Sequence, residues 1–351
     1  MPRLSRRALI AGVAAVSALP AAVASAARAA ATAPDAKRTL GRNGIEVSAV
    51  GLGCNNFGMR LDYAGTERVV HAAVDMGVTL FDTADVYGRG VSEEYLGKAL
   101  GPRRAKVVIA TKFGSPMGAG PFPQGGGSRA AIMSLAEDSL RRLGTDVIDL
   151  YQYHRPDGVT PMEETLRALD DLVKQGKVRA IGHSNFTAAQ ARECAAISAN
   201  GKLTAYATAQ NHYSLLTRDI EAELVPACEE LGLGVLPFFP LESGMLTGKY
   251  KRDEKPAEGT RMAAWSANPA AAERFMNDAI FTKVEKLTAI ADGAGVTLLD
   301  MAFGWLLSKP YISSVIAGAT RPEQIEANVK AAAWRPTADI DRAIDAVTKS
   351  A

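Results

Sequence analysis

Four polar residues of types that can move protons follow short apolar runs of the chain: Asp82, Tyr87, Lys112 and His154. A tyrosine with a pKa of about 10 is a poor acid at neutral pH, but a neighbouring ammonium favours its ionised form and lowers the pKa. Lys112 can be that neighbour, with Asp82 fixing it through a charge-assisted bond. His154 can donate a hydrogen bond to a carbonyl oxygen on which negative charge develops. The four together are suited to protonating a nascent alkoxide.

Each of these residues also has a structural interpretation when taken alone: an ion pair, a packed aromatic or a core histidine. Their positions relative to the predicted strands favour chemistry. Apolar runs alternate with amphipathic stretches of helical period, as in repeated β-α units. The predicted strands are 49–53, 79–83, 107–112, 147–154, 179–184, 206–211, 234–238 and 314–317. The predicted helices include 65–76, 129–143, 161–175, 187–199 and 219–231.

Eight strands with eight crossovers predict an α/β fold, a closed (β/α)₈ TIM barrel in one domain, which commonly takes about 250 residues. Active sites of this fold lie at the carboxyl ends of the strands, so the four residues should meet at one mouth. An N-terminal β-hairpin is predicted to turn at Asn43-Gly44, and Thr160-Pro161 to open a helix. The glycine- and proline-rich gap 242–278 after strand 7 is predicted as a large loop over the active face, and a helix near 339–347 should pack outside.

The N-terminus has a different composition from the rest of the chain. Arg3, Arg6 and Arg7 precede an uncharged, alanine-rich stretch, and Ala24-Ser25-Ala26 has the small-residue pattern of a signal peptidase site. Residues 5–10 also resemble a twin-arginine signal. We therefore expect a twin-arginine signal peptide at 1–26, a tether at 27–38, the barrel at 39–351 and a periplasmic location. The alternatives are a membrane anchor, or a misassigned start site before a cytoplasmic enzyme.

Composition excludes several classes of protein. The 351 residues are 47% hydrophobic and 22% charged, as in globular proteins. A net charge of +2 is too small for a nucleic-acid binder. Cys54, Cys194 and Cys228 are too widely spaced for a disulfide framework or a zinc pattern, and the four histidines form no metal motif, so no metal is expected. Gly51-Leu52-Gly53 begins like a dinucleotide fingerprint, but Asn56 replaces its third glycine, which argues against a Rossmann fold.

From about residue 40 to residue 333 the sequence resembles the aldo-keto reductase superfamily. Asp82 with Tyr87 five positions later, Thr111-Lys112 and Tyr153-His154 are similar to its catalytic tetrad in order and spacing. The resemblance implies that the tyrosine is the general acid/base, that lysine and aspartate tune it, and that histidine orients the substrate carbonyl. It implies an oxidoreductase that uses NADP (NADPH), with NAD possible, and interconverts a small-molecule aldehyde or ketone and its alcohol.

The same resemblance implies a nicotinamide site built from several strand ends. The implied cofactor-binding residues are Gly53, Cys54, Asn55, Ser184, Asn185, Gln210, Phe238, Phe239, Pro240, Leu241, Ser243, Gly244, Lys249, Gly318, Ala319, Arg321, Gln324 and Asn328. The implied substrate contacts are Asn55, Phe57, Tyr87, Tyr153 and His154. Phe238 takes the position of the aromatic that stacks on nicotinamide, and Pro322 would start a helix whose free amides face phosphate. Many relatives carry a cation directly after strand 8, whereas here the nearest cation is Arg321.

A second hypothesis is a redox-sensing, cofactor-binding barrel, because the superfamily includes barrel subunits of potassium channels that turn over slowly. Export strengthens this alternative, since nicotinamide cofactors are not freely regenerated outside the cytoplasm. The complete tetrad favours catalysis. The sequence indicates neither the substrate nor the oligomeric state.

Overall fold

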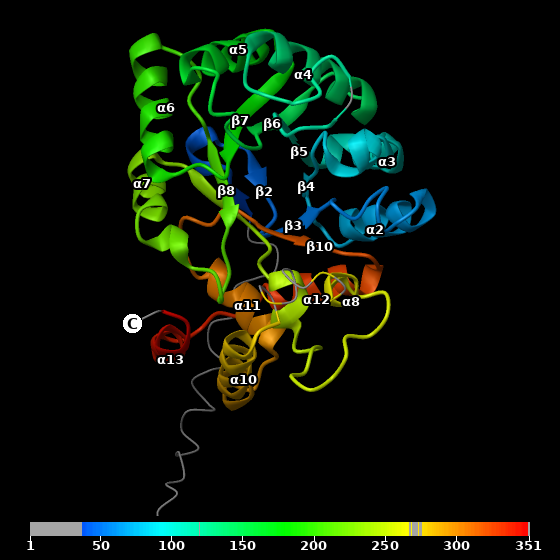
Figure 1. The fold of residues 1–351 in the computed structure, drawn as a ribbon, viewed down its shortest axis with the longest axis vertical. Coiled ribbons are helices and arrows are strands. Elements are labelled where there is room, and N and C mark those ends of the chain that lie inside the picture. Colours follow the sequence, from blue (N-terminus) through cyan, green and yellow to red (C-terminus); the bar gives the residue numbers. More distant parts are fainter. Residues whose placement is uncertain (1–36, 119, 267, 269–272, 274–275, 350–351) are drawn as a thin grey trace, which may run out of the picture.

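The computed structural model describes residues 37–118, 120–266, 268, 273 and 276–349 (Figure 1). The predicted signal peptide 1–26, and the predicted tether up to residue 36, lie outside the described residues. Arg38, the last residue of the predicted tether, already belongs to the fold, because its guanidinium donates to the carbonyl oxygen of Ile312 at 2.6 Å.

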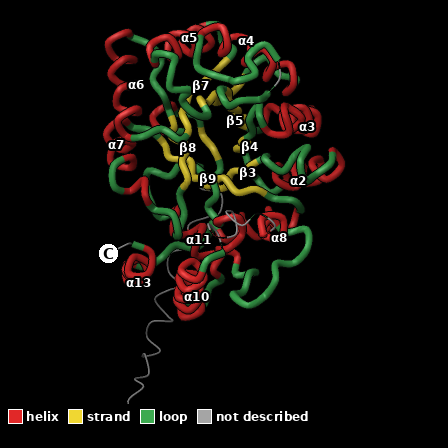
Figure 2. Tube along the Cα trace, in the orientation of Figure 1, coloured by secondary structure: helices red, strands yellow, loops and turns green. Residues whose placement is uncertain are grey.

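Eight parallel strands surround the centre of the molecule in the order β10-β3-β4-β5-β6-β7-β8-β9 (Figure 2). They are β3 (Val50–Gly53), β4 (Leu80–Asp82), β5 (Val108–Phe113), β6 (Ile148–Tyr153), β7 (Val178–Ser184), β8 (Thr208–His212), β9 (Gly234–Phe238) and β10 (Val315–Gly318). The two ends of this order, β9 and β10, are joined through Val235 of β9. Its amide donates to the carbonyl of Tyr311 at 2.8 Å, and its carbonyl accepts from the amide of Ser313 at 2.9 Å. The predicted (β/α)₈ TIM barrel is confirmed.

Helices surround this sheet on the outside (Figure 1). They are α2 (Tyr63–Asp75), α3 (Val91–Leu100), α4 (Arg129–Leu143), α5 (Met162–Lys174), α6 (Ala188–Gly201), α7 (Leu224–Leu231), α8 (Arg261–Ser266), α10 (Asp278–Gly293), α11 (Leu298–Leu307), α12 (Pro322–Ala331) and α13 (Ala338–Thr348). Most start where a small polar side chain accepts from a free amide of the first turn, as Ser128 does from Ala131 and Thr187 from Gln190. As expected, α13 lies outside the barrel, against α10.

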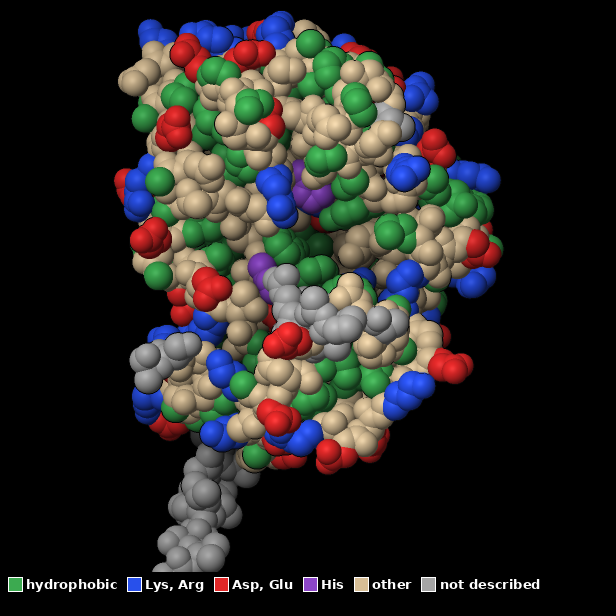
Figure 3. Space-filling view, viewed as in Figure 1, with side chains coloured by type: hydrophobic (Ala, Val, Ile, Leu, Met, Phe, Trp, Pro, Cys, Tyr) green, Lys and Arg blue, Asp and Glu red, His purple; other side chains and the backbone are tan. Residues whose placement is uncertain are grey.

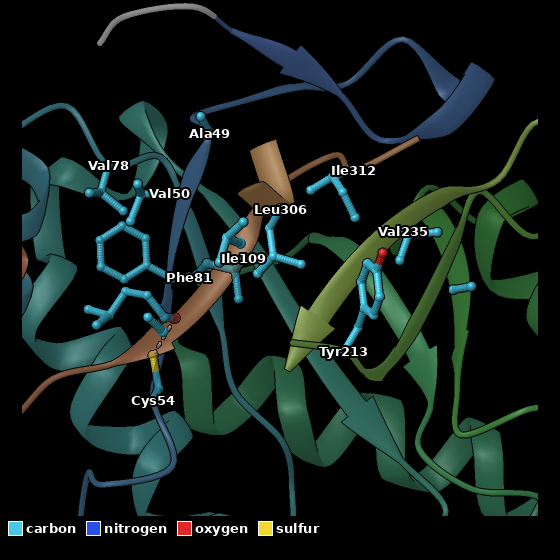
Figure 4. Packing of buried hydrophobic residues seen from close by; sticks show 14 of the residues in the cluster. Ala49, Val50, Cys54, Val78, Phe81, Ile109, Tyr213, Val235, Leu306 and Ile312 are labelled. Carbon is cyan, nitrogen blue, oxygen red and sulfur yellow. Dashed lines mark hydrogen bonds between the residues drawn. The ribbon is translucent and has the colours of Figure 1, made fainter. Parts of the chain in front are cut away.

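Two buried layers follow from the alternation of side chains along each strand. Leu80 points into the barrel, while the next residue, Phe81, packs outward against the helices with Val50 and Val78 (Figure 4). The inner layer is small and is completed by the N-terminal hairpin, β1 (Arg38–Thr39) with β2 (Glu46–Val47). Its members are Leu40, Ile45, Val47, Leu80, Val108, Ala110, Leu150, Ala180, Ala207, Leu236 and Ile316. The hairpin therefore contributes directly to the core of the barrel.

Local predictions needed three corrections. The hairpin reverses through a 3-10 turn (Gly41–Asn43, η1) before Gly44 at φ +83°, because Thr39 pairs with Glu46. Pro161 is itself the N-cap of α5, and the Thr160 hydroxyl donates instead to Asp157 at 2.6 Å.

The third correction concerns the helix predicted at 219–231, which divides into a 3-10 turn (Asp219–Glu221, η4) and α7. Pro226 has no amide hydrogen, so a helix can accommodate it only within the first turn. A helix that starts at Leu224 meets this requirement, whereas one that starts at Asp219 would not.

The long segment after β9 crosses the carboxyl end of the barrel and contains a further 3-10 turn (Glu242–Thr247, η5) and α8. All three cysteines are buried and free. Within the described ranges, no single helix is long and apolar enough to cross a membrane, and α10 with α11 meets that test only as a pair bent by 89°.

Candidate active site

Asp82 and Lys112 form a buried ion pair at the ends of neighbouring strands. Lys112 Nζ donates to Asp82 Oδ2 at 2.7 Å and to the carbonyl of Thr83 at 2.9 Å. Burial lowers the pKa of Lys112, but Asp82 and Tyr87 together raise it above its ordinary value. The lysine therefore carries a positive charge at neutral pH although its side chain is fully buried.

Tyr87 begins a short 3-10 turn (Tyr87–Gly90, η2), and Lys112 Nζ lies 5.2 Å from the centre of its ring. Burial raises the pKa of Tyr87, and the positive charge of Lys112 lowers it, as the sequence predicts. The net pKa is nevertheless raised, because the loss of hydration outweighs the charge of the lysine. Tyr87 keeps its proton at neutral pH and can donate it.

His154 follows β6, and its ring meets that of Tyr87 edge to face, with 6.0 Å between the ring centres. Burial, together with Lys112 and Arg155, lowers the pKa of His154 to about 3. The imidazole is therefore neutral at physiological pH and carries one N–H. Asn185 Nδ2 donates to the His154 carbonyl at 3.0 Å, which ties this strand end to the end of β7.

Two glutamines hold the second oxygen of Asp82. Gln210 Nε2 donates to Asp82 Oδ1 at 2.8 Å, and Gln152 Nε2 donates to the same atom at 3.2 Å. The sequence predicted a role for Gln210 but none for Gln152. The available signal was the alternation of side chains, because Gln152 lies two residues after Leu150 and so points into the barrel as well.

A cavity of about 680 Å³ opens above these residues, a size within the range of small-molecule sites. Figure 3 shows a hollow near the centre of one face, with hydrophobic side chains in it and a histidine beside it. The predicted residues that line the cavity are Gly53, Asn55, Asp82, Tyr87, His154, Ser184, Asn185, Gln210, Phe238, Phe239, Pro240, Leu241, Ser243, Gly244, Lys249, Gly318, Arg321, Gln324 and Asn328. Lys112 lies behind this wall, against Asp82.

Four predicted contacts need correction, because Cys54, Phe57, Tyr153 and Ala319 do not line the cavity and are at most 1% exposed. Tyr153 points away from the barrel interior and stacks on a neighbouring aromatic, Phe113, with ring centres 5.0 Å apart. Adjacent strand residues face opposite sides, so His154 and Tyr153 cannot both reach the mouth.

The sequence analysis also missed part of the lining. The additional residues include Arg60, Arg155, Thr247, Gly259, Thr260, Arg261 and Leu299. Most belong to loops, whose path depends on packing rather than on a local pattern. Arg261 illustrates this, because it comes from the long segment after β9 and reaches Asn56, to which its Nη2 donates at 3.2 Å.

Residues that the sequence assigns to a nucleotide cofactor line one end of the cavity. Pro322 starts α12 as predicted, and Arg321 and Gln324, at the beginning of this helix, both line the cavity. Among the described residues, the buried Ser243 hydroxyl has no hydrogen-bond partner. A Cβ at Gly318 would come within 3.2 Å of the Asn56 side chain, so a larger residue at this position would have to displace that side chain.

The segment from Phe239 to Ser243 is strained and well anchored. Phe239, Glu242 and Ser243 all have positive φ, at 52°, 44° and 56°. Glu242 is held by the Ser214 hydroxyl at 2.5 Å and by His212 Nε2 at 2.8 Å. Burial raises the pKa of Glu242, but the hydrogen bonds from His212, Ser214 and Thr217 lower it by more. The net pKa of Glu242 is therefore below its ordinary value. These contacts attach the strained segment to the end of β8 and the loop that follows it.

His183 provides a test of stability outside the cavity. It is fully buried and stacks on Phe186, and within the described part of the chain neither ring nitrogen has a hydrogen-bond partner. Burial lowers its pKa to about 3. Below pH 6.5 the unfolded chain binds a proton that the folded protein rejects until about pH 3, so stability falls as the pH falls through this window.

In the wild-type protein, His183 should cost about 1.4 kcal/mol of unfolding free energy for each pH unit below 6.5. We expect His183→Leu to remove this cost. The measurement is the thermal unfolding midpoint of both proteins at pH 7.0 and pH 4.5, with His71→Gln as the control. Equal acid sensitivity of the wild-type protein and His183→Leu would show that His183 does not resist protonation.

The comparisons with known proteins agree with this geometry. The sequence model of the aldo/keto reductase family matches residues 49–349. A probable voltage-gated potassium channel subunit beta of Arabidopsis thaliana is 37% identical over 300 residues, which cover 84% of this chain and 90% of the relative. A protein of the same description from Oryza sativa subsp. japonica is 37% identical over 320 residues, covering 89% of this chain and 96% of the relative.

A third relative, the uncharacterized oxidoreductase YrpG of Bacillus subtilis (strain 168), is 36% identical over 302 residues, covering 83% of this chain and 89% of the relative. The chain belongs to the aldo/keto reductase family, a family of NAD(P)H-dependent oxidoreductases.

Proposed function

We propose that this protein is an NADP-dependent aldo-keto reductase that interconverts an aldehyde or ketone and its alcohol, with Tyr87 as the general acid/base. One observation carries the proposal. A fully buried, charged Lys112 is paired with Asp82 next to Tyr87, and a neutral His154 meets the same tyrosine at the wall of the cavity. This arrangement provides a proton donor and a hydrogen-bond donor for a carbonyl oxygen.

The residues act on the substrate oxygen as follows. The nicotinamide cofactor, when bound, supplies the hydride. His154 holds the carbonyl oxygen through its N–H, and Tyr87 donates its proton as negative charge develops there. Lys112 stabilises the tyrosinate that remains, and Asp82 holds the ammonium in place. In alcohol oxidation the same groups act in reverse, with ionised Tyr87 accepting the proton.

Cationic side chains on the cavity wall support a phosphate-bearing cofactor. Lys249, Arg261 and Arg321 line the cavity, and Arg321 also caps α12. The Arg321 side chain is 67% exposed, and its ion pair with Glu323 is long, at 3.7 Å. It is therefore able to turn toward a 2′-phosphate.

We expect Arg321→Ala to weaken NADPH binding about tenfold, the value of one charge-assisted contact, and to leave NADH binding unchanged. Fluorescence titration with both nucleotides measures the ratio. Arg342→Ala, an exposed arginine on α13, is the control for lost surface charge. An equal loss for NADH and NADPH would remove Arg321 from the 2′-phosphate site.

A second candidate is a cofactor-binding redox sensor, which is favoured by the two plant relatives described as potassium channel subunits. Such a protein would hold its cofactor tightly and turn over slowly. Purified protein titrated with NADPH and NADH, then assayed at the nicotinamide absorbance with a panel of aldehydes and cyclic ketones, separates the two. Binding with turnover supports the reductase, and binding without turnover supports the sensor. The absence of binding would contradict both.

We also propose, from the N-terminal sequence alone, that residues 1–26 are a twin-arginine export signal and that the mature protein is periplasmic. N-terminal sequencing of the protein recovered from periplasmic and cytoplasmic fractions tests this. A mature chain that begins near residue 27 in the periplasm supports export. A cytoplasmic chain that begins downstream of the two arginines would support a misassigned start site instead.

A further inference from the structure

A second group of buried ionisable side chains lies behind the barrel wall and outside the cavity. It consists of Asp85, Glu93 on α3, Arg142 on α4 and Tyr151 on β6, packed where these helices cover β4, β5 and β6. None of the four lines the active-site cavity. Asp85 nevertheless lies in the loop that joins Asp82 to Tyr87, so this group adjoins the tetrad along the chain.

Glu93 and Arg142 satisfy each other. Arg142 Nε donates to Glu93 Oε2 at 2.6 Å, and the Thr111 hydroxyl donates to Glu93 Oε1 at 2.5 Å. The Glu93 side chain is completely buried, and that of Arg142 is 9% exposed. Arg142 is therefore paired with Glu93, and its charge lowers the pKa of Asp85 by less than burial and Glu93 raise it.

Asp85 and Tyr151 are left without such partners. Both are fully buried, and among the described residues neither oxygen of Asp85 nor the Tyr151 hydroxyl meets the geometry of a hydrogen bond. Burial raises the pKa of Asp85 to about 7, and Glu93 adds to the rise, while the Val86 amide, Arg142 and Lys112 oppose it. A buried carboxyl group without a partner is tolerated far better in its neutral form than as an anion.

The backbone of Asp85 connects this group to the catalytic residues. Its amide donates to the carbonyl of Lys112 at 3.1 Å, and the Tyr87 amide donates to Ala84 at 3.1 Å. The loop thus extends the pairing of β4 with β5 and sets Tyr87 against Lys112. An unpaired anion at Asp85 would favour movement of this loop toward water, and Tyr87 would move with it.

We propose that Asp85 is a positioning residue: the loop between Asp82 and Tyr87 keeps its catalytic position while the buried, unpartnered carboxyl group of Asp85 is uncharged. The inference rests on the proposed reductase function for its kinetic readout. The charged and titratable groups that face Asp85 are Glu93 from α3, Arg142 from α4, Lys112 from β5 and Tyr151 from β6. Neither Tyr87 nor His154 titrates between pH 6 and 8.5, so comparison with Asp85→Asn shows whether a change of rate in this window depends on Asp85.

The experiment is the pH profile of kcat for carbonyl reduction at saturating NADPH in four proteins. We expect wild-type kcat to fall about fivefold between pH 6 and 8.5, with an inflection near pH 7 and an unchanged KM for NADPH. Asp85→Asn copies the neutral carboxyl group, so its kcat should stay within about twofold of the wild-type value at pH 6 and remain flat to pH 8.5. Asp170→Asn removes a comparably buried aspartate on α5 and should keep the wild-type fall.

Glu93→Gln is the fourth protein and serves if Asp85→Asn does not fold. The Glu93 carboxylate raises the pKa of Asp85, so its removal should move the inflection to lower pH. A wild-type profile in Asp85→Asn overturns the proposal. So does an equal loss of kcat at every pH, which would indicate a structural role only. An unmoved inflection in Glu93→Gln would also overturn it.

Thermal unfolding distinguishes failure of this inference from failure of the proposed function. A folded-state pKa above the unfolded value means that the wild-type protein loses stability as the pH rises from about 4 to 7. The unfolding midpoint of Asp85→Asn should therefore exceed that of the wild-type protein at pH 8 and approach it at pH 5. If the wild-type protein lacks turnover but shows this difference, the reductase proposal fails while Asp85 retains its proton. If turnover is present and the difference is absent, the inference about Asp85 fails.

Discussion

Tyr87→Phe is expected to lower kcat for carbonyl reduction at least ~100-fold, because it removes the group that donates a proton to the substrate oxygen. The ring remains, so the packing against His154 and the shape of the cavity are kept. The dissociation constant for NADPH should change by less than about twofold, since the hydroxyl acts on the substrate. Steady-state kinetics and fluorescence titration of the same preparation measure both quantities.

The pH dependence adds a second check on Tyr87. Because burial raises the tyrosine pKa above its ordinary value, carbonyl reduction should show no loss of the tyrosine proton below about pH 10. Alcohol oxidation needs the ionised form and should accelerate as the pH rises toward that value. A variant that loses cofactor affinity in proportion to kcat would contradict the role assigned to Tyr87.

Lys112→Met is the second change with a large expected effect, and it should reduce both catalysis and stability. Among the described residues, Lys112 is the only cation that forms an ion pair with Asp82. The variant removes it and leaves the Asp82 carboxylate, which is 4% exposed, without a counter-charge. Breaking a buried pair on one side costs about 3 kcal/mol or more of unfolding free energy. Without the ammonium, ionisation of Tyr87 also becomes harder, so kcat should fall at least ~100-fold.

A double variant separates the two effects of Lys112. In Asp82→Asn/Lys112→Met the unpaired charge is gone, and the asparagine can still bond to Gln152 and Gln210. We expect urea unfolding to show recovery of most of the lost stability, with kcat remaining low. Recovery of kcat together with stability would mean that Lys112 supports the fold and not the tyrosine.

The sequence by itself predicted the barrel and the four residues that we propose as the tetrad. Eight short apolar runs separated by helical stretches favour a closed parallel barrel, in which polar residues at the strand ends meet at one mouth. For this reason Asp82, Tyr87, Lys112 and His154 were predictable before their distances were known. The ends of individual helices were less predictable. Thr160 was expected to cap α5, but its hydroxyl donates to Asp157 instead.

Only the tertiary structure decided which residues near the tetrad face the cavity and which of them are charged at neutral pH. Tyr153 and His154 are adjacent in sequence, yet one faces the helices and the other the cavity, because side chains alternate along a strand. Arg261 reaches the cavity along a loop path that no local pattern encodes. The raised pKa values of Tyr87 and Asp85 arise from burial by segments distant in sequence, and desolvation is a property of the packed structure rather than of residue type.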